Sequence, residues 1–347
     1  MFASHRDACI LSKYSSDLVH RLDEWYAEKG LDDTVIAYRS LGKSNYHFAK
    51  RVEEFVRSNP SLTVMCFDVT GFFNNLDHRR LKARLKAILK CEELDSDWYA
   101  VFKAVTNYRY VNLDDLKKHE VLAQRIKARK PHPLTTIQRV KALRIPINKN
   151  LADKGIPQGT PVSASLSNLY MTEFDEQMES EASSRGALYQ RYSDDILIAC
   201  SKGSWEYLHR LVSEKLEEHG LNLEKSKTDI VHLHGINALR FQYLGYQLGL
   251  GQAQLRQKSL SRQWRTAKRA IRKAERMGLH AIAKGNAKKI YTRKLHLRFT
   301  SAGNRNFIGY ANRSAEALES AAIRKQTKRL RKYVHSELAR IKRKNRV

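Results

Sequence analysis

Two adjacent aspartates lie where a turn would present both carboxylates to one metal site. Asp194 and Asp195 belong to ALYQRYSDDILIAC, in which two short apolar runs, residues 187–192 and 196–200, flank a polar SDD. This pattern predicts a β-hairpin with the acids at its tip. Successive side chains of a plain strand point to opposite faces. The pair can therefore serve one metal cluster only at such a bend.

A third aspartate ends another predicted strand. Residues 62–67 are apolar, are bounded by Pro60 and Gly71, and lead directly to Asp68. Such a run is typical of a buried strand. We expect Asp68 at the exit of this strand, where it could join Asp194 and Asp195.

Three neighbouring carboxylates predict phosphoryl-transfer chemistry. Mg²⁺ prefers carboxylate oxygen, and two divalent ions would relieve the mutual repulsion of the acids. Two ions about 4 Å apart can activate an attacking oxygen and stabilise the leaving oxygen of an in-line displacement. Taken alone, each acid would more readily be interpreted as a surface carboxylate. Their combination, with a glycine turn between them in sequence, favours nucleotidyl transfer.

The remaining segments alternate helical patterns with turns. We predict helices over residues 76–91 and 97–106, and an irregular insertion with one or two helices over residues 107–150. The turn KGIPQGTP opens a helix that should end near Gly186, and LRFQYLGYQLGL suggests a strand pair. Basic helices are expected near residues 256–278, 280–295 and 313–344.

Positive charge is concentrated in residues 251–347. This segment contains 28 Lys and Arg against 4 Glu, a net charge of +24 out of +28 for the whole chain. Six aromatic residues, among them Trp264 and Tyr333, are interleaved with the charge, unlike in a disordered basic tail. Nucleic acid is the expected partner, with an anionic membrane surface or a polyanionic protein as the alternatives.

Cysteine usage and hydropathy predict a cytoplasmic protein. Cys9, Cys66, Cys91 and Cys200 are isolated, without the paired spacing of a zinc site or a disulfide framework. The first sixteen residues lack an uninterrupted apolar core, and no stretch is apolar enough to span a bilayer. We therefore expect no membrane association.

Five segments, in order, resemble the motifs of reverse transcriptases. FDVTGFFNNLDH is similar to motif A, GIPQGTPVSASLSNLYM to motif B, and YSDD to motif C. LNLEKSKT resembles motif D, and FQYLGY resembles the primer-grip motif E. The resemblance implies an α+β, right-hand polymerase with fingers, an antiparallel-sheet palm and a helical thumb. It also implies an RNA-directed DNA polymerase.

The resemblance assigns roles to the catalytic centre. Asp68 and Asp194 would be the ligands shared by two Mg²⁺ ions, with Asp195 as the additional ligand and the backbone carbonyl of Val69 completing one shell. Mn²⁺ is a substitute. Lys227 would be the motif D lysine that protonates departing pyrophosphate, which suits a positioned Lys donor; a solvated lysine in a charged loop is the alternative.

Further residues are implied to bind the incoming dNTP. Gln158 and Gly159 would line the nucleotide. Phe73 corresponds to the steric gate, a ring that would collide with a 2′-hydroxyl; a core phenylalanine is the alternative, as we expect for Phe72. RNA-dependent RNA polymerases typically use a polar acid at the gate.

Two basic residues of the segment AYRSLGKSN are triphosphate candidates. Arg39 and Lys43 offer a guanidinium fork and an ammonium to phosphate oxygens. Contact with a nucleic-acid backbone is the alternative for both. This segment departs from retron and group II intron reverse transcriptases, and is most like that of the bacterial defence-associated, or unknown-group, enzymes.

These observations predict residues 1–250 as a fingers and palm domain and residues 251–347 as a basic helical thumb. No ribonuclease H or endonuclease residues follow motif E, which suggests a free-standing enzyme for anti-phage defence. Structured non-coding RNA as template, nascent DNA and dNTPs are the expected partners, and a second reverse transcriptase or an effector protein is a further candidate. RNA-dependent RNA synthesis, template-independent or protein-templated DNA synthesis, and non-catalytic nucleic-acid binding remain open, as does oligomeric state.

Overall fold

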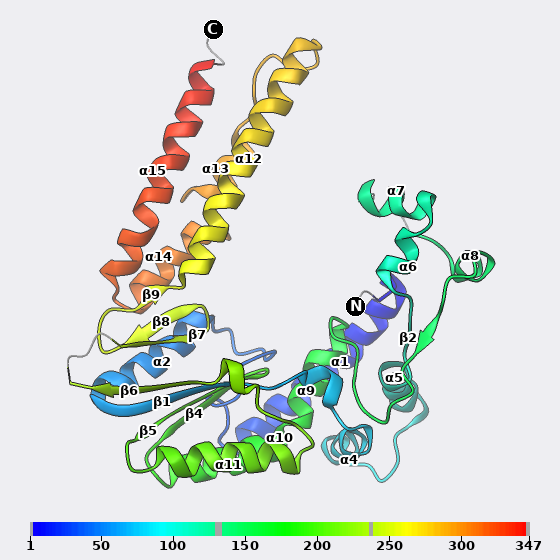
Figure 1. Ribbon diagram of the computed structural model, residues 1–347, viewed down its shortest axis with the longest axis vertical. Helices are drawn as coiled ribbons and strands as arrows, with labels where there is room; N and C mark the ends of the chain where they lie inside the picture. Colours follow the sequence, from blue (N-terminus) through cyan, green and yellow to red (C-terminus); the bar gives the residue numbers. More distant parts are fainter. Residues whose placement is uncertain (1–2, 129–133, 236–238, 345–347) are drawn as a thin grey trace. The chain divides into compact units, whose positions relative to one another are not determined.

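Helices and antiparallel strands share the chain, as the α+β class requires (Figure 1). The structure is a computed structural model that describes residues 3–128, 134–235 and 239–344. The helices are α1 (His5–Glu28), α2 (Asn45–Ser58), α3 (Phe72–Asn75), α4 (His78–Leu89), α5 (Ser96–Thr106), α6 (Leu113–Lys117), α7 (Glu120–Ala128), α8 (Ile137–Ala142), α9 (Pro161–Tyr170), α10 (Thr172–Ser183), α11 (Trp205–Glu218), α12 (Gln257–Ala283), α13 (Arg293–Phe299), α14 (Phe307–Ala317) and α15 (Ala321–Lys344), with the 3-10 helix η1 (Lys225–Lys227). The strands are β1 (Ser61–Asp68), β2 (Arg109–Tyr110), β3 (Asn148–Lys149), β4 (Leu188–Tyr192), β5 (Asp195–Ser201), β6 (Asp229–His234), β7 (Arg240–Tyr243), β8 (Tyr246–Gly249) and β9 (Gln254–Leu255).

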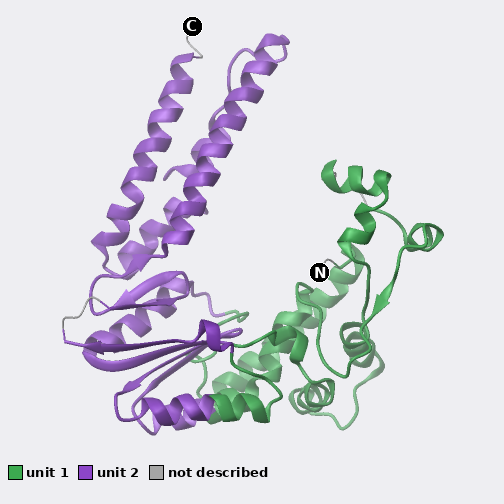
Figure 2. Cartoon of the chain, viewed as in Figure 1, with its two compact units in different colours: residues 1–40, 69–177, 213–223 green, residues 41–68, 178–212, 224–347 purple. Residues whose placement is uncertain are grey.

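The chain divides into two compact units (Figure 2). Unit 1 comprises Met1–Ser40, Val69–Gln177 and Ser213–Leu223. Unit 2 comprises Leu41–Asp68, Met178–Val212 and Glu224–Val347. The division predicted at residue 250 separates a fingers and palm domain from a thumb by their expected functions, whereas these two units are defined by internal contacts. The predicted division therefore stays a prediction.

A four-stranded antiparallel sheet in the order β4-β5-β1-β6 forms the centre of unit 2. Its inner strands are buried along most of their length, as the apolar runs of the sequence predicted. Helix α2 and the small β7-β8-β9 sheet bury Val52, Val56 and Phe241 in one core with Leu62 and Val64 of β1. This packing holds the ends of β1 and β5 in a defined place.

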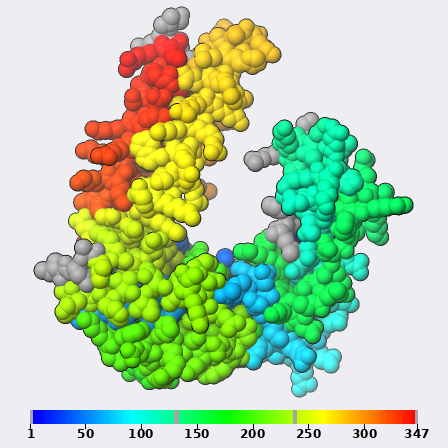
Figure 3. Space-filling model, in the orientation of Figure 1, coloured from blue at the N-terminus to red at the C-terminus, as the bar shows by residue number. Residues whose placement is uncertain are grey.

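Part of the basic C-terminal segment, residues 251–347, folds on a core of its own, and the rest of the segment joins the core of the sheet. Helices α12 and α15 run side by side (Figures 1 and 3) and bury Ile271, Leu330, Val334 and Ile341 together. The first predicted helix is therefore found, with shifted ends. The third, predicted over residues 313–344, is divided: α14 ends at Ala317, Glu319 adopts a left-handed φ of 47°, and α15 begins at Ala321.

The helix predicted over residues 280–295 is wrong. Helix α12 ends at Ala283, and Gly285 then adopts a left-handed φ of 71°. The amide of Asn286 donates to the Ala281 carbonyl and that of Gly285 to the Ile282 carbonyl. This Schellman-type cap stops the helix, and the next one, α13, begins only at Arg293.

The insertion over residues 107–150 is more ordered than predicted. Its described part contains three short helices, α6 to α8, and the strand pair β2-β3, where one or two helices were expected. Leu122, Val140 and Ile145 form a small buried cluster that stabilises it. Residues 129–133, with two of its prolines, lie outside the described residues.

The glycine turn GIPQG packs against the short helix α3 within unit 1. The amide of Gly155 donates to the Leu76 carbonyl, and that of Ile156 donates to the Phe73 carbonyl, both over 2.8 Å. The helix predicted to follow this turn as far as Gly186 is instead two helices, α9 and α10, which meet at Met171.

No helix among the described residues is long and apolar enough to cross a membrane. All four cysteines are free thiols.

We predict that Gly155→Ala destabilises unit 1 more than Gly30→Ala does. Gly155 has a φ of +88°, and an added Cβ would lie 2.9 Å from the Asn74 carbonyl oxygen, whereas Gly30 has a φ of +68° with open space around it. Both variants carry backbone strain, but only Gly155→Ala adds a clash, so it should lose about 1–3 kcal/mol of unfolding free energy. Urea denaturation measures this; equal losses for the two variants would contradict the packing described.

Candidate active site

A cleft of about 610 Å³ opens in unit 2 where β1 ends and β5 begins. Asp68 and Asp195 line it, together with the basic side chains of Lys227 and Arg256. Tyr243 also lines it, and its hydroxyl donates to Oε1 of Gln190 over 3.0 Å. Two predicted acids and two basic side chains therefore face one space.

Strand register brings the acids together. Asp68, the last residue of β1, pairs directly with Asp195, the first residue of β5. Residues directly opposite in an antiparallel pair have Cβ atoms about 4.5–5.5 Å apart. Asp194 precedes Asp195 in the β4–β5 turn and is half-buried. The predicted hairpin with acid at its tip is thus present, although Asp194 does not line the cleft itself.

Two features of the sequence shape the turn that carries these acids. Ser193 adopts a left-handed φ of 60°, which bends the chain between β4 and β5. Arg191 is fully buried, and its Nη1 donates to the Ser193 carbonyl over 2.9 Å. The buried side chain of Arg191 therefore stabilises the turn through this hydrogen bond. Sequence reasoning missed Arg191 because a charged residue in a short strand is normally expected to face solvent.

The electrostatics of the cleft favour a cation. The pKa of Asp195 is raised to about 6, first by desolvation in the cleft and then by the negative charges of Asp194 and Asp68, while Lys227 and Arg256 lower it. Asp195 remains exposed to solvent. A bound cation would relieve the repulsion between Asp195 and the neighbouring carboxylates.

Lys227 supplies a positive charge to Asp68. Its Nζ lies 2.9 Å from Oδ1 of Asp68, and this hydrogen bond raises the pKa of the lysine. η1, which ends at Lys227, places it there, and the amide of Glu224 donates to the Asp68 carbonyl beside it. The predicted motif D lysine is thus in the candidate site.

The donors that could hold metal are carboxylate oxygens, the chemistry that Mg²⁺ and Mn²⁺ prefer. Within the described ranges, no three His, Cys, Asp or Glu side chains are gathered closely enough to form a ready ligand cluster. Lys227 already contacts Oδ1 of Asp68, so a metal ion at this oxygen would replace its ammonium. Val69, the predicted backbone ligand, is buried and begins the next segment of unit 1.

The predicted nucleotide-binding residues Phe73, Gln158 and Gly159 lie together in unit 1. Phe73 is half-buried beside the buried Phe72, with ring centroids 5.4 Å apart, and its carbonyl accepts the hydrogen bond from Ile156 at the start of the GIPQG turn. Gln158 is exposed, and Gly159 has a φ of 102°. The predicted gate and the predicted nucleotide-lining turn thus share one local structure.

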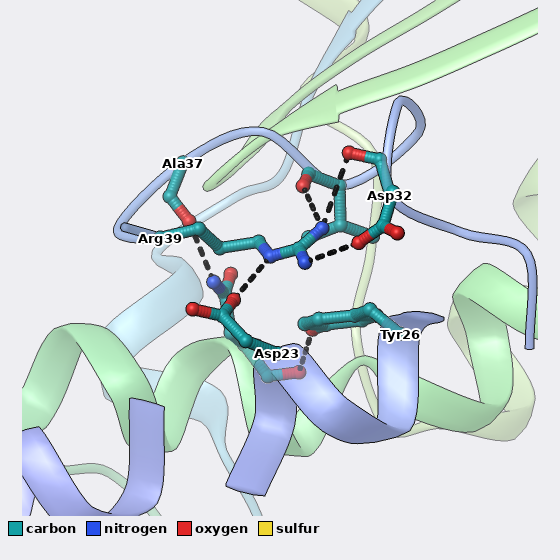
Figure 4. Close-up of polar contacts among 7 residues, drawn as sticks. Asp23, Tyr26, Asp32, Ala37 and Arg39 are labelled. Atoms are coloured by element: carbon teal, nitrogen blue, oxygen red, sulfur yellow. Dashed lines mark hydrogen bonds and ion pairs between the residues drawn. The ribbon is translucent and has the colours of Figure 1, made fainter. Parts of the chain in front are cut away.

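Arg39 is held in an ion-pair network (Figure 4). Its side chain is 2 % exposed; Nε donates to Asp23 over 2.6 Å and Nη2 donates to Asp32 over 2.7 Å. The guanidinium also lies 4.5 Å from the Tyr26 ring centroid. These contacts tie the loop after α1 to the helix, and the triphosphate role of Arg39 stays a prediction.

Lys43 is exposed and belongs to unit 2, two residues before Asn45, which lines the cleft. Its predicted phosphate contact stays a prediction. Arg256 is a cleft residue that sequence reasoning missed, because it stands among many basic residues at the start of α12.

Carboxylates at the ends of adjacent antiparallel strands, with cations beside them, are typical of enzymes that transfer nucleotidyl groups with divalent metal ions. A comparison with known protein families matches residues 8–248 to the family described as reverse transcriptase (RNA-dependent DNA polymerase). The chain belongs to this family. The predicted fold and enzyme class, RNA-directed DNA polymerase and hence nucleotidyltransferase, are confirmed at this level. No curated protein matched in sequence.

Among solved structures, the chain is similar to telomerases of two Candida species. Apo telomerase from Candida tropicalis, truncated from its C-terminal domain, matches with a TM-score of 0.48 and 12% identity over 71% of this chain and 45% of that one. Telomerase from Candida albicans in complex with a TWJ fragment of telomeric RNA matches with a TM-score of 0.43 and 14% identity over 75% and 42%. The chain therefore spans less than half the length of these neighbours.

We predict that Arg191→Met lowers kcat while leaving KM for dNTP nearly unchanged, because Arg191 positions the turn without lining the cleft. The unpaired Ser193 carbonyl should cost about 1–3 kcal/mol of stability, and a displacement of the acids by about 1 Å could lower the rate roughly 100-fold. Steady-state kinetics and thermal denaturation measure both effects. Arg191→Lys, which keeps the charge, should retain more activity, and wild-type kcat in folded Arg191→Met would exclude the positioning role.

Proposed function

We propose that this chain catalyses RNA-directed DNA synthesis, the transfer of dNMP from a dNTP to a primer 3′-hydroxyl with release of pyrophosphate. The observation that carries the proposal is the pairing of Asp68 with Asp195 in register at the mouth of a cleft that also contains Lys227. The family match over residues 8–248 supports it.

The acidic residues would hold the catalytic metal. Asp68 and Asp194 would bind two Mg²⁺ or Mn²⁺ ions, with Asp195 and the Val69 carbonyl as further ligands. When bound, the ions activate the attacking oxygen and stabilise the leaving oxygen. The pKa of Asp195 is raised first by desolvation and then by Asp194 and Asp68, and nearby positive charge would offset the repulsion from these two acids.

Lys227 would act as the proton donor to pyrophosphate. A lysine carries its proton at neutral pH, and the hydrogen bond to Asp68 raises the pKa of Lys227 further. Released from Asp68, the same ammonium could neutralise and protonate a leaving phosphate oxygen. Arg256, on the same cleft wall, would hold further negative charge of the substrate.

Five residues would recognise the dNTP. Gln158 and Gly159 would line the nucleotide, Phe73 would exclude a 2′-hydroxyl, and Lys43 would approach the triphosphate. Arg39 would join Lys43 only by exchanging its ion pairs with Asp23 and Asp32 for phosphate oxygens. The net charge of +24 in residues 251–347 supports binding of the template–primer duplex through its phosphates.

We predict that Asp194→Asn or Asp195→Asn abolishes DNA synthesis and leaves folding and RNA binding nearly intact. The amide keeps the shape of the side chain but removes the charge that would bind metal. A primer-extension assay with an RNA template and dNTPs measures the activity, and melting temperature controls for folding. Asp229→Asn, which changes another acid that lines the cleft, is the matched control. Wild-type synthesis by both variants would refute the two-metal proposal.

We predict that Phe73→Ala allows ribonucleotides to be incorporated. Removing the ring should reduce the preference for dNTP over NTP by roughly 10- to 100-fold, the range that a side-chain-sized change in a pocket supplies. Single-nucleotide extension with each substrate measures the ratio, and Phe73→Tyr, which keeps the ring, should retain the preference. An unchanged ratio in folded Phe73→Ala would return this residue to a packing role.

We further propose a cytoplasmic role in bacterial anti-phage defence, in which an associated structured RNA is copied into DNA with or without a second reverse transcriptase or effector protein. The support is the resemblance of the AYRSLGKSN segment to defence-associated reverse transcriptases. Retrons and group II introns are more distant by the same segment. Purifying the chain with its bound RNA, supplying dNTPs and sequencing the product would separate templated from untemplated or protein-templated synthesis.

We predict that the gene, expressed with its flanking sequence in a sensitive bacterium, lowers plaquing of at least one phage in a broad panel. The Asp194→Asn/Asp195→Asn double variant should abolish protection because the proposed role requires synthesis. Efficiency of plaquing on both strains is the measurement. Equal plaquing across the panel would contradict defence and leave the polymerase proposal standing.

A further inference from the structure

A second hollow, of about 400 Å³, lies in the basic C-terminal segment, apart from the active-site cleft. Its lining comes from β9 and from the N-terminal parts of α12 and α15. Helix α12 follows β9 directly in the chain, and α15 packs against β9. Leu260, Trp264 and Ala322 line its apolar part, while Gln257, Lys325 and Arg329 are exposed at its edge. None of the described residues that line it is acidic.

Trp264 is held in place by its neighbours. Its ring packs on Tyr333 of α15 with centroids 5.2 Å apart, and Nζ of Lys268 lies 5.5 Å from the tryptophan ring and 5.8 Å from the tyrosine ring. Trp264 thus contacts the core on one side and lines the hollow on another. An ordered half-buried indole is a suitable stacking platform.

The walls of the hollow are also fixed before any ligand binds. Nε2 of Gln326 donates to the Leu255 carbonyl, and its Oε1 accepts from the Leu255 amide over 2.9 Å, which ties α15 to β9. Ser320 Oγ donates to the Ala253 carbonyl over 2.6 Å. A ligand would therefore meet a preformed site with little ordering cost.

We propose that this hollow binds one unpaired nucleobase of a single-stranded nucleic acid. The base stacks on Trp264, the Gln257 amide faces the base edge, and Lys325 and Arg329 hold the flanking phosphates. Duplex binding through phosphates would need the positive charge but not an aromatic hollow, and an acidic peptide would gain little from the indole. The inference rests on the proposed nucleic-acid function and adds a site away from the catalytic acids.

The test compares a short RNA with the same strand without bases. The full-length chain is titrated with fluorescent A12 RNA and with an abasic 12-mer, by anisotropy and by quenching of tryptophan fluorescence. Ala322→Phe fills the hollow without changing any charge. Ala321→Phe, at the neighbouring exposed position outside the lining, is the matched control.

Wild type and Ala321→Phe should bind A12 roughly tenfold or more tighter than the abasic strand, as expected for one stacked base. Ala322→Phe should lose this preference and the quenching, with binding of the abasic strand unchanged. A preference retained in full by folded Ala322→Phe, or absent from wild type, would overturn the proposal. A parallel titration with dA12 shows whether the site binds RNA alone or both RNA and DNA. Loss of the preference for bases in Ala322→Phe, on RNA alone or on both kinds of strand, supports the site.

Charge variants provide a second arm. Lys325→Gln/Arg329→Gln should lower the salt slope of A12 binding by about 0.7 for each phosphate that the variant no longer neutralises. Arg324→Gln/Lys328→Gln, an equal charge change at exposed positions of α15 outside the lining, should lower it less; equal effects would overturn the phosphate assignment. Primer extension by the same variants is scored separately, so failure of the polymerase proposal leaves these binding results interpretable.

Discussion

The antiparallel register of β1 and β5 is the constraint on which the candidate site depends, because it places Asp68 opposite Asp195. At an effective dielectric constant of 20, two unit charges 4 Å apart interact with about 4 kcal/mol. An exposed lysine offsets little of such repulsion, since surface ion pairs contribute about 0–1 kcal/mol, and Lys227 is 62 % exposed. The packed sheet therefore holds together carboxylates that would otherwise separate. Desolvation in the cleft, together with this repulsion, raises the pKa of Asp195 to about 6.

Buried polar groups in this protein position the exposed ones. Arg191 is buried beside the β4–β5 turn and donates a hydrogen bond to the Ser193 carbonyl. This contact fixes the orientation of Asp194 and Asp195, which follow Ser193. The side chain of Arg39 is also buried, at 2 % exposure. Two carboxylates and the Tyr26 ring surround it and bind the loop to α1. Desolvating an arginine is costly unless it is paired, which explains why the guanidinium groups of Arg191 and Arg39 have defined acceptors. Burial and partners, more than residue type, separate a structural arginine from one available to a substrate.

The positive charge of residues 251–347 is compatible with an ordered fold because it lies on helices with an apolar seam. Ile271, Leu330, Val334 and Ile341 give α12 and α15 a common core, and the long basic side chains project from it. Where Glu275 meets Arg340 and Lys344, the acid lowers the local repulsion between the helices, and its own pKa is lowered to about 2 by these two partners. A rigid basic surface of this kind can present aromatic and amide groups in fixed positions, which a flexible tail cannot do.

The sequence alone determined the elements whose patterns are local. The apolar run ending in Asp68, the hairpin around Asp194 and the concentration of basic residues after residue 250 were all predicted, because strand burial, turn formation and net charge depend on neighbouring residues. Tertiary structure decided the rest. Three contacts join residues that are distant in sequence or lie in different elements. These are the β1–β5 register, the ion pair of Lys227 with Asp68, and the ion pairs of Arg39 with Asp23 and Asp32. The extra helix of the insertion and the stop at Gly285 were likewise missed, since a small core and a cap outweighed the local pattern.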